Sequence, residues 1–335
     1  MEIVFVHLNT RVPRYLYWNI KTHIERFPEH RVTLIHSKHI KAPSIAGLNT
    51  TPADEDHRWR KLDQLYSHPK NFRANFWLTS SVRLFALENY LKKFRNEIIH
   101  LESDVVLSPD FPFDKFSELK ESLAFPLISN NRGVASVVYI RNIEAARILT
   151  STLIKEASID RQTTEMLSLR KVYERFQAKV HVISIGPTPS FFRNIEAKIM
   201  ESFMESFHHF KGIFDGAEIG QFFLGTDPRN RRGRKVLRND LMNGYIDVTS
   251  LALEFNAKRR FVNVISKKGS ISIKLFAIHI PSKETKYFRS KSQCKALKKA
   301  CKESNRGSKI QFVKKTIIMS IFQSAARRAS QFRGK

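Results

Sequence analysis

The 335-residue chain has few of the residues that characterise disulfide-rich, fibrous or linker proteins. Its two cysteines, Cys294 and Cys301, are too few for a disulfide framework and favour a reducing compartment. With 12 glycines and 12 prolines, it is neither collagen-like nor a low-complexity linker. No apolar run approaches the roughly 20 residues of a membrane-spanning helix. Residues 2–6 also lack signal-peptide features, so a soluble or membrane-peripheral protein of the cytoplasm is expected.

Several motifs of well-known enzyme classes are also missing. The sequence contains no G-x-x-x-x-G-K-[ST] phosphate loop, no G-x-G-x-x-G dinucleotide loop and no G-x-S-x-G nucleophile turn. It contains neither H-E-x-x-H nor C-x-x-C, which are common in zinc proteins. Predictions of a P-loop kinase, a Rossmann dehydrogenase, a serine hydrolase or a zinc protein therefore lose their usual support.

Positive charge is abundant: 58 Lys and Arg oppose 31 Asp and Glu, a net charge of +27. Such a charge attracts polyanions such as nucleic acid, anionic membranes or phosphorylated substrates. Residues 283–335 hold 16 Lys and Arg against two acids, and apolar clusters occur at residues 310–313 and 317–322. The sequence therefore predicts a folded domain over residues 1–285 and a basic, amphipathic helical tail over residues 286–335.

Strand-like and helical patterns alternate through the first 285 residues. Residues 3–8 form an apolar run typical of a buried strand, residues 15–27 have a helical apolar stripe, and residues 31–36 return to a strand pattern. This order predicts a βαβ unit and an α/β domain with a parallel sheet. The polar residues 41–60 are expected to form a long loop. Further helices are expected at residues 76–94, 143–155 and 163–176, and strands at 98–101, 122–128, 135–140, 180–185 and 261–264.

Two acids, Glu102 and Asp104, follow the apolar strand pattern of residues 98–101. Side chains alternate along an extended chain, but a bend at the strand end lets both carboxylates converge on one cation. Mg²⁺ and Mn²⁺ bind carboxylate oxygens and share their other positions with phosphates. An isolated acidic pair at a strand end is also compatible with an ordinary solvated turn.

Two later segments place polar residues among glycines or after apolar strands. Residues 214–230 contain three of the 12 glycines, which allow a ligand to approach the backbone closely. A helix start followed by a structural turn is the alternative there. In residues 277–283, His279 follows an apolar strand and precedes Lys283, and imidazole with carboxylates suits Mn²⁺. A lone histidine is also compatible with a purely structural position.

Residues 76–104 resemble the nucleotide-binding half of bacterial GT-A glycosyltransferases, which have an Asp-x-Asp metal motif after a strand. Residues 214–230 resemble the D-G-A-x-x-G-Q-x-x-x-G-x-D-P-R-N segment of capsular and lipopolysaccharide glycosyltransferases. The resemblance implies a GT-A fold, with a mixed, mostly parallel sheet flanked by helices. It also implies Mn²⁺ or Mg²⁺ bound by Asp104, Glu102 and a late histidine, His279. Because Glu102 replaces the family's first Asp, it is the weaker ligand and is also a candidate for contact with ribose or the donor sugar.

The same resemblance implies roles for residues that contact the sugars. Asp215 and Gln221 become candidates for contact with the donor sugar or the acceptor, and Asp215 is a candidate catalytic group. Glu165 occupies the place of an acid that meets the acceptor hydroxyl. Glu165 after two threonines is also a favourable helix start, which is the alternative interpretation.

Other residues are expected to bind the nucleotide. His7 and Asn9 follow the first strand, where the carboxyl ends of strands lie beside the base and ribose in nucleotide-binding α/β folds. Arg83 and Lys283 are expected to reach the diphosphate. Ser103, between the two acids, is assigned to the same nucleotide-sugar site.

Taken together, these features predict a metal-dependent glycosyltransferase of surface polysaccharide biosynthesis. Its donor would be a nucleotide-diphosphate sugar, a UDP-sugar by default, and its acceptor a glycan or lipid-linked glycan. The basic tail would attach it to the anionic inner face of the membrane. The alternative is a basic nucleic-acid- or membrane-binding protein without transferase activity. No specific nucleic acid is expected, because the charge follows no recognisable reading motif.

Overall fold

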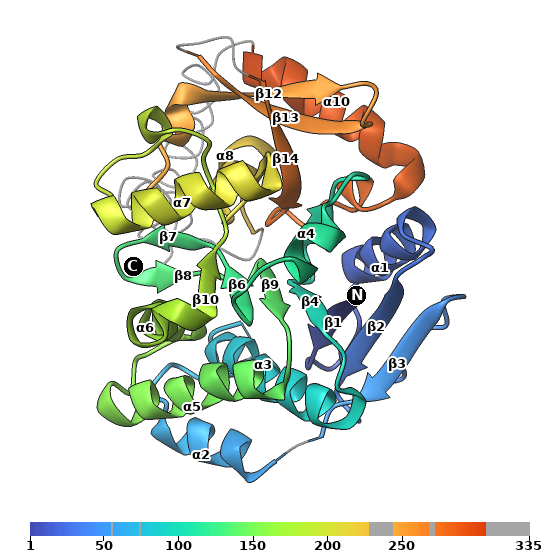
Figure 1. Ribbon diagram of the computed structural model, residues 1–335. Coiled ribbons are helices and arrows are strands. Elements are labelled where there is room, and N and C mark those ends of the chain that lie inside the picture. Colours follow the sequence, from blue (N-terminus) through green and yellow to red (C-terminus); the bar gives the residue numbers. More distant parts are fainter. Residues whose placement is uncertain (55, 74, 228–243, 268–271, 306–335) are drawn as a thin grey trace, which may run out of the picture.

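A seven-stranded sheet forms the centre of the computed structural model, which describes residues 1–54, 56–73, 75–227, 244–267 and 272–305 (Figure 1). Within this sheet β9 alone runs antiparallel to its neighbours. Across the sheet, the strands are β10 (Val180–Val182), β6 (Leu123–Phe125), β9 (Val137–Ile140), β4 (Ile98–Leu101), β1 (Glu2–His7), β2 (Arg31–His36) and β3 (Leu48–Pro52). The predicted α/β class with a mixed, mostly parallel sheet flanked by helices is confirmed.

Helices cover both faces of this sheet, which explains the continuous apolar run of its first strand. In β1, the side chain of Val4 joins one hydrophobic cluster, whereas Ile3 and Phe5 join another together with Leu16 and Ile20. One face is covered by α1 (Arg14–Arg26) and α4 (Phe113–Ser117). The other face is covered by α2 (His57–Leu65), α3 (Phe76–Phe94), α5 (Ile143–Ile159) and α6 (Glu165–Arg175).

A smaller five-stranded sheet lies at one end of the molecule (Figure 1). It contains β11 (Ile213–Phe214), β14 (Ser272–His279), β13 (Phe261–Ser266), β12 (Leu251–Asn256) and β5 (Val105–Leu107), which pairs with β14. The other described elements are β7 (Leu127–Ser129), β8 (Arg132–Gly133), α7 (Ala197–Phe210), α8 (Glu218–Leu224), α10 (Ser290–Asn305), η1 (Gln177–Lys179), η2 (Pro189–Phe191), η3 (Val248–Ser250) and η4 (Thr285–Tyr287).

Helix α10 belongs to the folded body rather than to a separate tail. Its residues Leu297 and Cys301 are buried, and the hydroxyl of Ser304 accepts a hydrogen bond from the N–H of Leu253 in β12 (3.2 Å). The folded body therefore extends beyond the predicted domain boundary at residue 285. Apolar side chains alternate with lysines along α10, and the apolar ones face the small sheet at β12. The rest of the predicted tail, residues 306–335 with both apolar clusters, lies outside the described residues.

The expectation of a loop over residues 41–60 is wrong. This stretch contains β3, which pairs with β2 in parallel, and the first turn of α2. The side chain of Asp56 caps α2 by accepting a hydrogen bond from the N–H of Arg58 (2.8 Å). Polar side chains and a terminal proline are tolerated in β3 because it is an edge strand.

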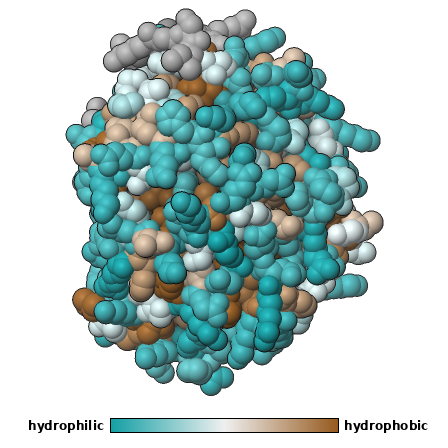
Figure 2. Space-filling view, in the orientation of Figure 1, coloured by the Kyte–Doolittle hydropathy of each residue, from teal (hydrophilic) through white to brown (hydrophobic). Residues whose placement is uncertain are grey.

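The surface gives no broad apolar face in the view of Figure 2, where apolar side chains form small patches between hydrophilic ones. Among the helices of the described ranges, none combines the length and apolarity needed to cross a bilayer.

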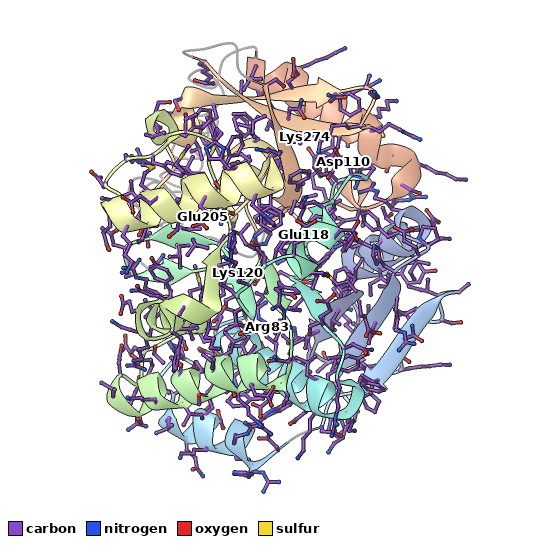
Figure 3. All side chains as sticks on the ribbon, in the orientation of Figure 1. Arg83, Asp110, Glu118, Lys120, Glu205 and Lys274 are labelled. Atoms are coloured by element: carbon purple, nitrogen blue, oxygen red, sulfur yellow. The ribbon has the colours of Figure 1, made fainter. Side chains whose placement is uncertain are left out.

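One ion pair joins β14 to the segment that follows β5. The guanidinium of Arg259, in the β12–β13 connection, donates to both carboxylate oxygens of Asp110 (2.8–3.0 Å) and to the carbonyl of Leu275 in β14 (3.1 Å). Lys274 lies 3.6 Å from the same carboxylate (Figure 3). These contacts fix the middle of β14, whose last residue is His279.

Replacing Asp110 with Asn is expected to lower the melting temperature at neutral pH. Burial alone would raise the pKa of Asp110, but the hydrogen bonds and charge of Arg259 outweigh burial and lower that pKa. Stabilisation by the pair is therefore present above the unfolded-state pKa, about 3.9, and is lost as the pH falls through the lower folded-state pKa. Because the Asp110 side chain is 35% exposed, screening limits the expected loss to about 1 kcal/mol.

Thermal unfolding of the wild type and of Asp110→Asn should be measured between pH 7 and pH 3. The difference between their melting temperatures should shrink as the pH falls. A difference that stays constant over this range would contradict a role for the charged carboxylate.

Candidate functional site

Two acids and a histidine meet where the large sheet adjoins the small one. Glu102 and Asp104 lie in the turn between β4 and β5, and His279 ends β14. Val105 pairs with His279 across the antiparallel β5–β14 ladder, and the N–H of Ile280 donates to the carbonyl of Asp104 (2.8 Å). One potential ligand atom from each of Glu102, Asp104 and His279 lies within 4.8 Å of the other two. The strand pairing therefore unites residues 175 positions apart in the chain.

The site has opposite charges in close contact. The Nε2 atom of His279 lies 2.9 Å from Oδ1 of Asp104 and 3.7 Å from Oε2 of Glu102. Burial alone would lower the pKa of His279, but the two carboxylates, Asp104 above all, raise it to about 9. Burial would raise the pKa of Asp104, but His279 and Lys283 outweigh it and hold that pKa well below its usual range. The carboxylates of Glu102 and Asp104 therefore favour a positively charged group next to them.

The donor set fits a divalent cation. Two carboxylates and one imidazole provide oxygen and nitrogen ligands, which suit Mn²⁺ and, through the carboxylates, Mg²⁺. Glu102 and Asp104 bring two negative charges, and their largely buried positions limit screening by solvent. The grouping of Glu102, Asp104 and His279 agrees with the metal ligands expected from the sequence.

Arg83 in α3, labelled in Figure 3, forms ion pairs with two acids from different elements. Its guanidinium lies 2.7 Å from Oε1 of Glu102 and 3.3 Å from Oε1 of Glu165, whose other oxygen accepts a hydrogen bond from Ser80 (2.9 Å). Burial raises the pKa of Glu165, although Arg83 partly opposes this shift. Thr164 also caps α6 by accepting from the N–H of Leu167 (3.3 Å), so Glu165 both begins a helix and faces the site.

These groups line one cavity of about 740 Å³. It lies at the carboxyl ends of β1 and β4, which is where open α/β sheets bind ligands. The sequence-predicted residues that line it are His7, Asn9, Arg83, Glu102, Ser103, Asp104, Glu165, Gln221, His279 and Lys283. The structure thus brings all the predicted site residues except Asp215 to one cavity.

Asp215 lies behind the cavity wall and not in it. It is 1% exposed, and its carboxylate accepts three backbone hydrogen bonds, from Ile219 (3.0 Å), Gly220 (2.8 Å) and His279 (3.0 Å). The sequence predicted that Asp215 contacts a substrate, but in the structure its carboxylate contacts the main chain. Both of its oxygens accept hydrogen bonds from backbone N–H groups. The carboxylate ties the start of α8 to the end of β14.

Gly220 is required for this junction. A Cβ atom at this position would lie 1.6 Å from the carbonyl oxygen of His279 and 2.8 Å from Oδ2 of Asp215. The glycine therefore allows α8 to contact the backbone of β14 directly.

Some cavity residues were not expected from the sequence. They include Tyr15, Arg73, Trp77, Glu218 and Asp227. Asp227 and Glu218 belong to the glycine-containing segment 214–230, so proximity in sequence could have indicated them. Tyr15 and Arg73 occur in segments without a recognisable motif. Residues 228–230 of the same segment lie outside the described residues.

No protein-family model matches the chain, and no curated protein matches it. Among solved structures, it is similar to the galactosyltransferase LgtC in complex with donor and acceptor sugar analogues. The identity is 15% over 57% of this chain and 76% of that chain, with a TM-score of 0.40. Mouse xyloside xylosyltransferase 1 has 8% identity over 63% and 93%, with a TM-score of 0.36. A glycosyltransferase involved in glycosylation of the major capsid of PBCV-1 has 14% identity over 54% and 82%, with a TM-score of 0.31. At such scores a likeness establishes no function.

Asp215→Asn is expected to destabilise the fold rather than only impair chemistry. The amide NH₂ would face at least one backbone N–H that now donates to the carboxylate, so a buried hydrogen bond would be lost. Leaving a buried donor unsatisfied costs about 1–3 kcal/mol, which chemical denaturation would detect. Wild-type stability combined with loss of activity would instead support a direct catalytic role for Asp215.

Proposed function

We propose that this chain is a metal-dependent glycosyltransferase that uses a nucleotide-diphosphate sugar. The observation that carries the proposal is the convergence of Glu102, Asp104 and His279, with Lys283 beside them, at one cavity. The volume of about 740 Å³ lies within the range of small-molecule sites, which is about 300–1,000 Å³. The resemblance of residues 76–104 and 214–230 to GT-A enzymes supports the same conclusion.

In this proposal, Asp104, Glu102 and His279 hold Mn²⁺ or Mg²⁺. Such a cation, when bound, offsets the negative charge that develops on a departing diphosphate. The ammonium of Lys283, 3.5 Å from Asp104, adds a fixed positive charge on the same side. His7 and Asn9, at the end of β1, are proposed to contact the base and ribose, with Ser103 beside the two acids.

The acceptor side of the cavity is assigned to Glu165 and Gln221. A carboxylate that accepts the proton of an attacking hydroxyl must lie within hydrogen-bond reach of it, and its pKa is best tuned upward from its usual value. Burial raises the pKa of Glu165 in this sense. Ser80 and Arg83 orient that carboxylate, and Gln221 offers an amide to sugar hydroxyls.

The proposed donor is a UDP-sugar, and the proposed acceptor is a glycan or lipid-linked glycan in surface polysaccharide biosynthesis. Support for this assignment comes from the segment 214–230 and its resemblance to polysaccharide-building enzymes. We place the protein in the cytoplasm, peripheral to the inner face of the membrane, where such acceptors are exposed.

Asp104→Ala tests the metal site directly. Nucleotide-diphosphate sugars with Mn²⁺ or Mg²⁺ are expected to raise the melting temperature of the wild type, because a ligand that binds only the native state stabilises it. The variant should lose this stabilisation and at least about a hundredfold in donor hydrolysis or transfer. Asp114→Ala, at an exposed position on α4, is the matched control and should behave like the wild type. Equal responses of all three proteins would refute the proposed function.

Removal of residues 306–335 tests the membrane assignment. This segment contributes eight Lys and Arg and no acids, and each basic residue near an anionic surface adds about 1 kcal/mol. Truncation after residue 305 keeps α10 and is expected to abolish co-sedimentation with phosphatidylserine-containing vesicles. The full chain should bind these vesicles and not neutral ones, and the binding should weaken with salt. Equal binding by both chains would contradict the role of this segment, and tight nucleic-acid binding by the truncated chain would favour the alternative without transferase activity.

A further inference from the structure

Two cations converge on one carboxylate next to the metal-site acids. The Nζ atom of Lys283 lies 2.7 Å from Oδ2 of Asp227, and Nη1 of Arg73 lies 3.6 Å from the same oxygen. The side chains of Arg73, Asp227 and Lys283 are 15%, 11% and 16% exposed, and all three residues line the cavity. Since Lys283 also lies 3.5 Å from Asp104, this cluster adjoins the proposed metal ligands.

Arg73 is held in position by its backbone and by two aromatic rings. Its φ of 49° is in the left-handed region, a strained conformation for a non-glycine residue that recurs at ligand sites. Its guanidinium carbon lies 5.2 Å from the ring centroid of Phe72 and 5.7 Å from that of Phe76. Both distances fall within the range of cation–π contact. The guanidinium is therefore preorganised before any ligand binds.

The hydrogen-bonding capacity of Arg73 is not exhausted by its protein contacts. Its Nε atom is buried and has no hydrogen-bond partner among the described residues. A buried donor without a partner is costly unless a ligand completes it. The planar guanidinium fork matches the oxygens of a phosphate, and the flanking ammonium of Lys283 adds a second positive charge.

We infer that Arg73 and Lys283 form a phosphate subsite, in which a phosphate group of the donor takes the place now held by the carboxylate of Asp227. This inference rests on the proposed function, and it assigns Arg73 to binding of the donor diphosphate. The aromatic pair Phe72 and Phe76 then acts indirectly, by holding the guanidinium at the cavity wall.

Calorimetric titrations in the presence of Mn²⁺ can separate phosphate contacts from base contacts. The ligands are uridine, UMP and UDP, the corresponding guanosine series, and inorganic pyrophosphate. The variants are Arg73→Ala and Arg73→Lys. Arg95→Ala is the matched control, because Arg95 also has a left-handed backbone (φ 54°) but is exposed at the end of α3, outside the residues that line the cavity.

Arg73→Ala is expected to raise the Kd of the diphosphate and of pyrophosphate about tenfold, which is the loss typical of one charge-assisted hydrogen bond. Nucleoside affinity should be unchanged, Arg73→Lys should lose less, and Arg95→Ala should match the wild type. Arg73→Lys keeps a cation at the site if the Ala variant unfolds. Unchanged diphosphate affinity in both variants, or equal loss for nucleoside and diphosphate, would overturn the inference while leaving the proposed function intact. Failure of the wild type to bind any diphosphate or pyrophosphate would instead defeat the proposed function.

Asp227→Asn tests whether the phosphate displaces the carboxylate. Without the competing charge, the Kd of the diphosphate should fall about fivefold, since a neighbouring like charge opposes binding by a comparable factor. A higher Kd of the diphosphate in Asp227→Asn would show that the carboxylate supports binding and does not compete with it. That result would overturn the inference that a phosphate displaces this carboxylate.

Discussion

The pairing of β5 with β14 controls the geometry of the candidate site. β5 begins immediately after Asp104, and β14 ends at His279, so the register of Val105 opposite His279 sets carboxylate and imidazole side by side. Because successive side chains of a strand point to opposite faces, a slip of one residue would turn His279 away from Asp104. β13 and β12 continue the same sheet beyond β14 and are covered by α10. The small sheet is thus the structural support of the site.

β14 is anchored at two points by side chains that are buried or partly buried. Near its middle, Arg259 joins it to Asp110. At its end, the carboxylate of Asp215 accepts the backbone N–H of His279 and of Gly220, and the missing side chain of Gly220 allows α8 to approach. This carboxylate can be buried there because three N–H groups satisfy its oxygens, although burial raises its pKa. Both anchors act on the backbone, so they position the imidazole without contacting a substrate.

Among the residues that the structure describes, the charge balance of the cavity differs from that of the whole chain. Although the net charge of the chain is +27, five acidic residues and four Lys or Arg residues of the described ranges line the cavity. The acids are Glu102, Asp104, Glu165, Glu218 and Asp227, and the cations are Arg73, Arg83, Arg132 and Lys283. Buried charges persist when they are paired, and a divalent cation or a phosphate changes which pairs form. A site of this composition can accept a metal ion and a diphosphate together, because each compensates the other.

Local sequence patterns were sufficient to predict two kinds of element. These are the strands that are covered on both faces and the helices that bury one face. Strands β1, β2 and β4 and helix α3 form where the apolar periodicity predicted them, with β1 spanning Glu2–His7 instead of residues 3–8. The edge strand β3 lacks such a pattern, because one of its sides has no neighbouring strand and its side chains are largely exposed or half-buried. Helix α7 was not among the predicted elements.

For the site, residue types after strand ends and the resemblance to GT-A enzymes were enough to indicate Glu102, Asp104 and His279 as a group. They also indicated which end of the sheet would carry the cavity. Only the tertiary structure decided that Asp215 serves the backbone and that Arg73 faces the cavity. The reason is physical: whether a carboxylate meets main-chain N–H groups or a ligand depends on how α8 docks on β14. Whether an arginine contacts two aromatic rings and lies near a lysine 210 positions later depends on chain crossings that leave no periodicity in the sequence.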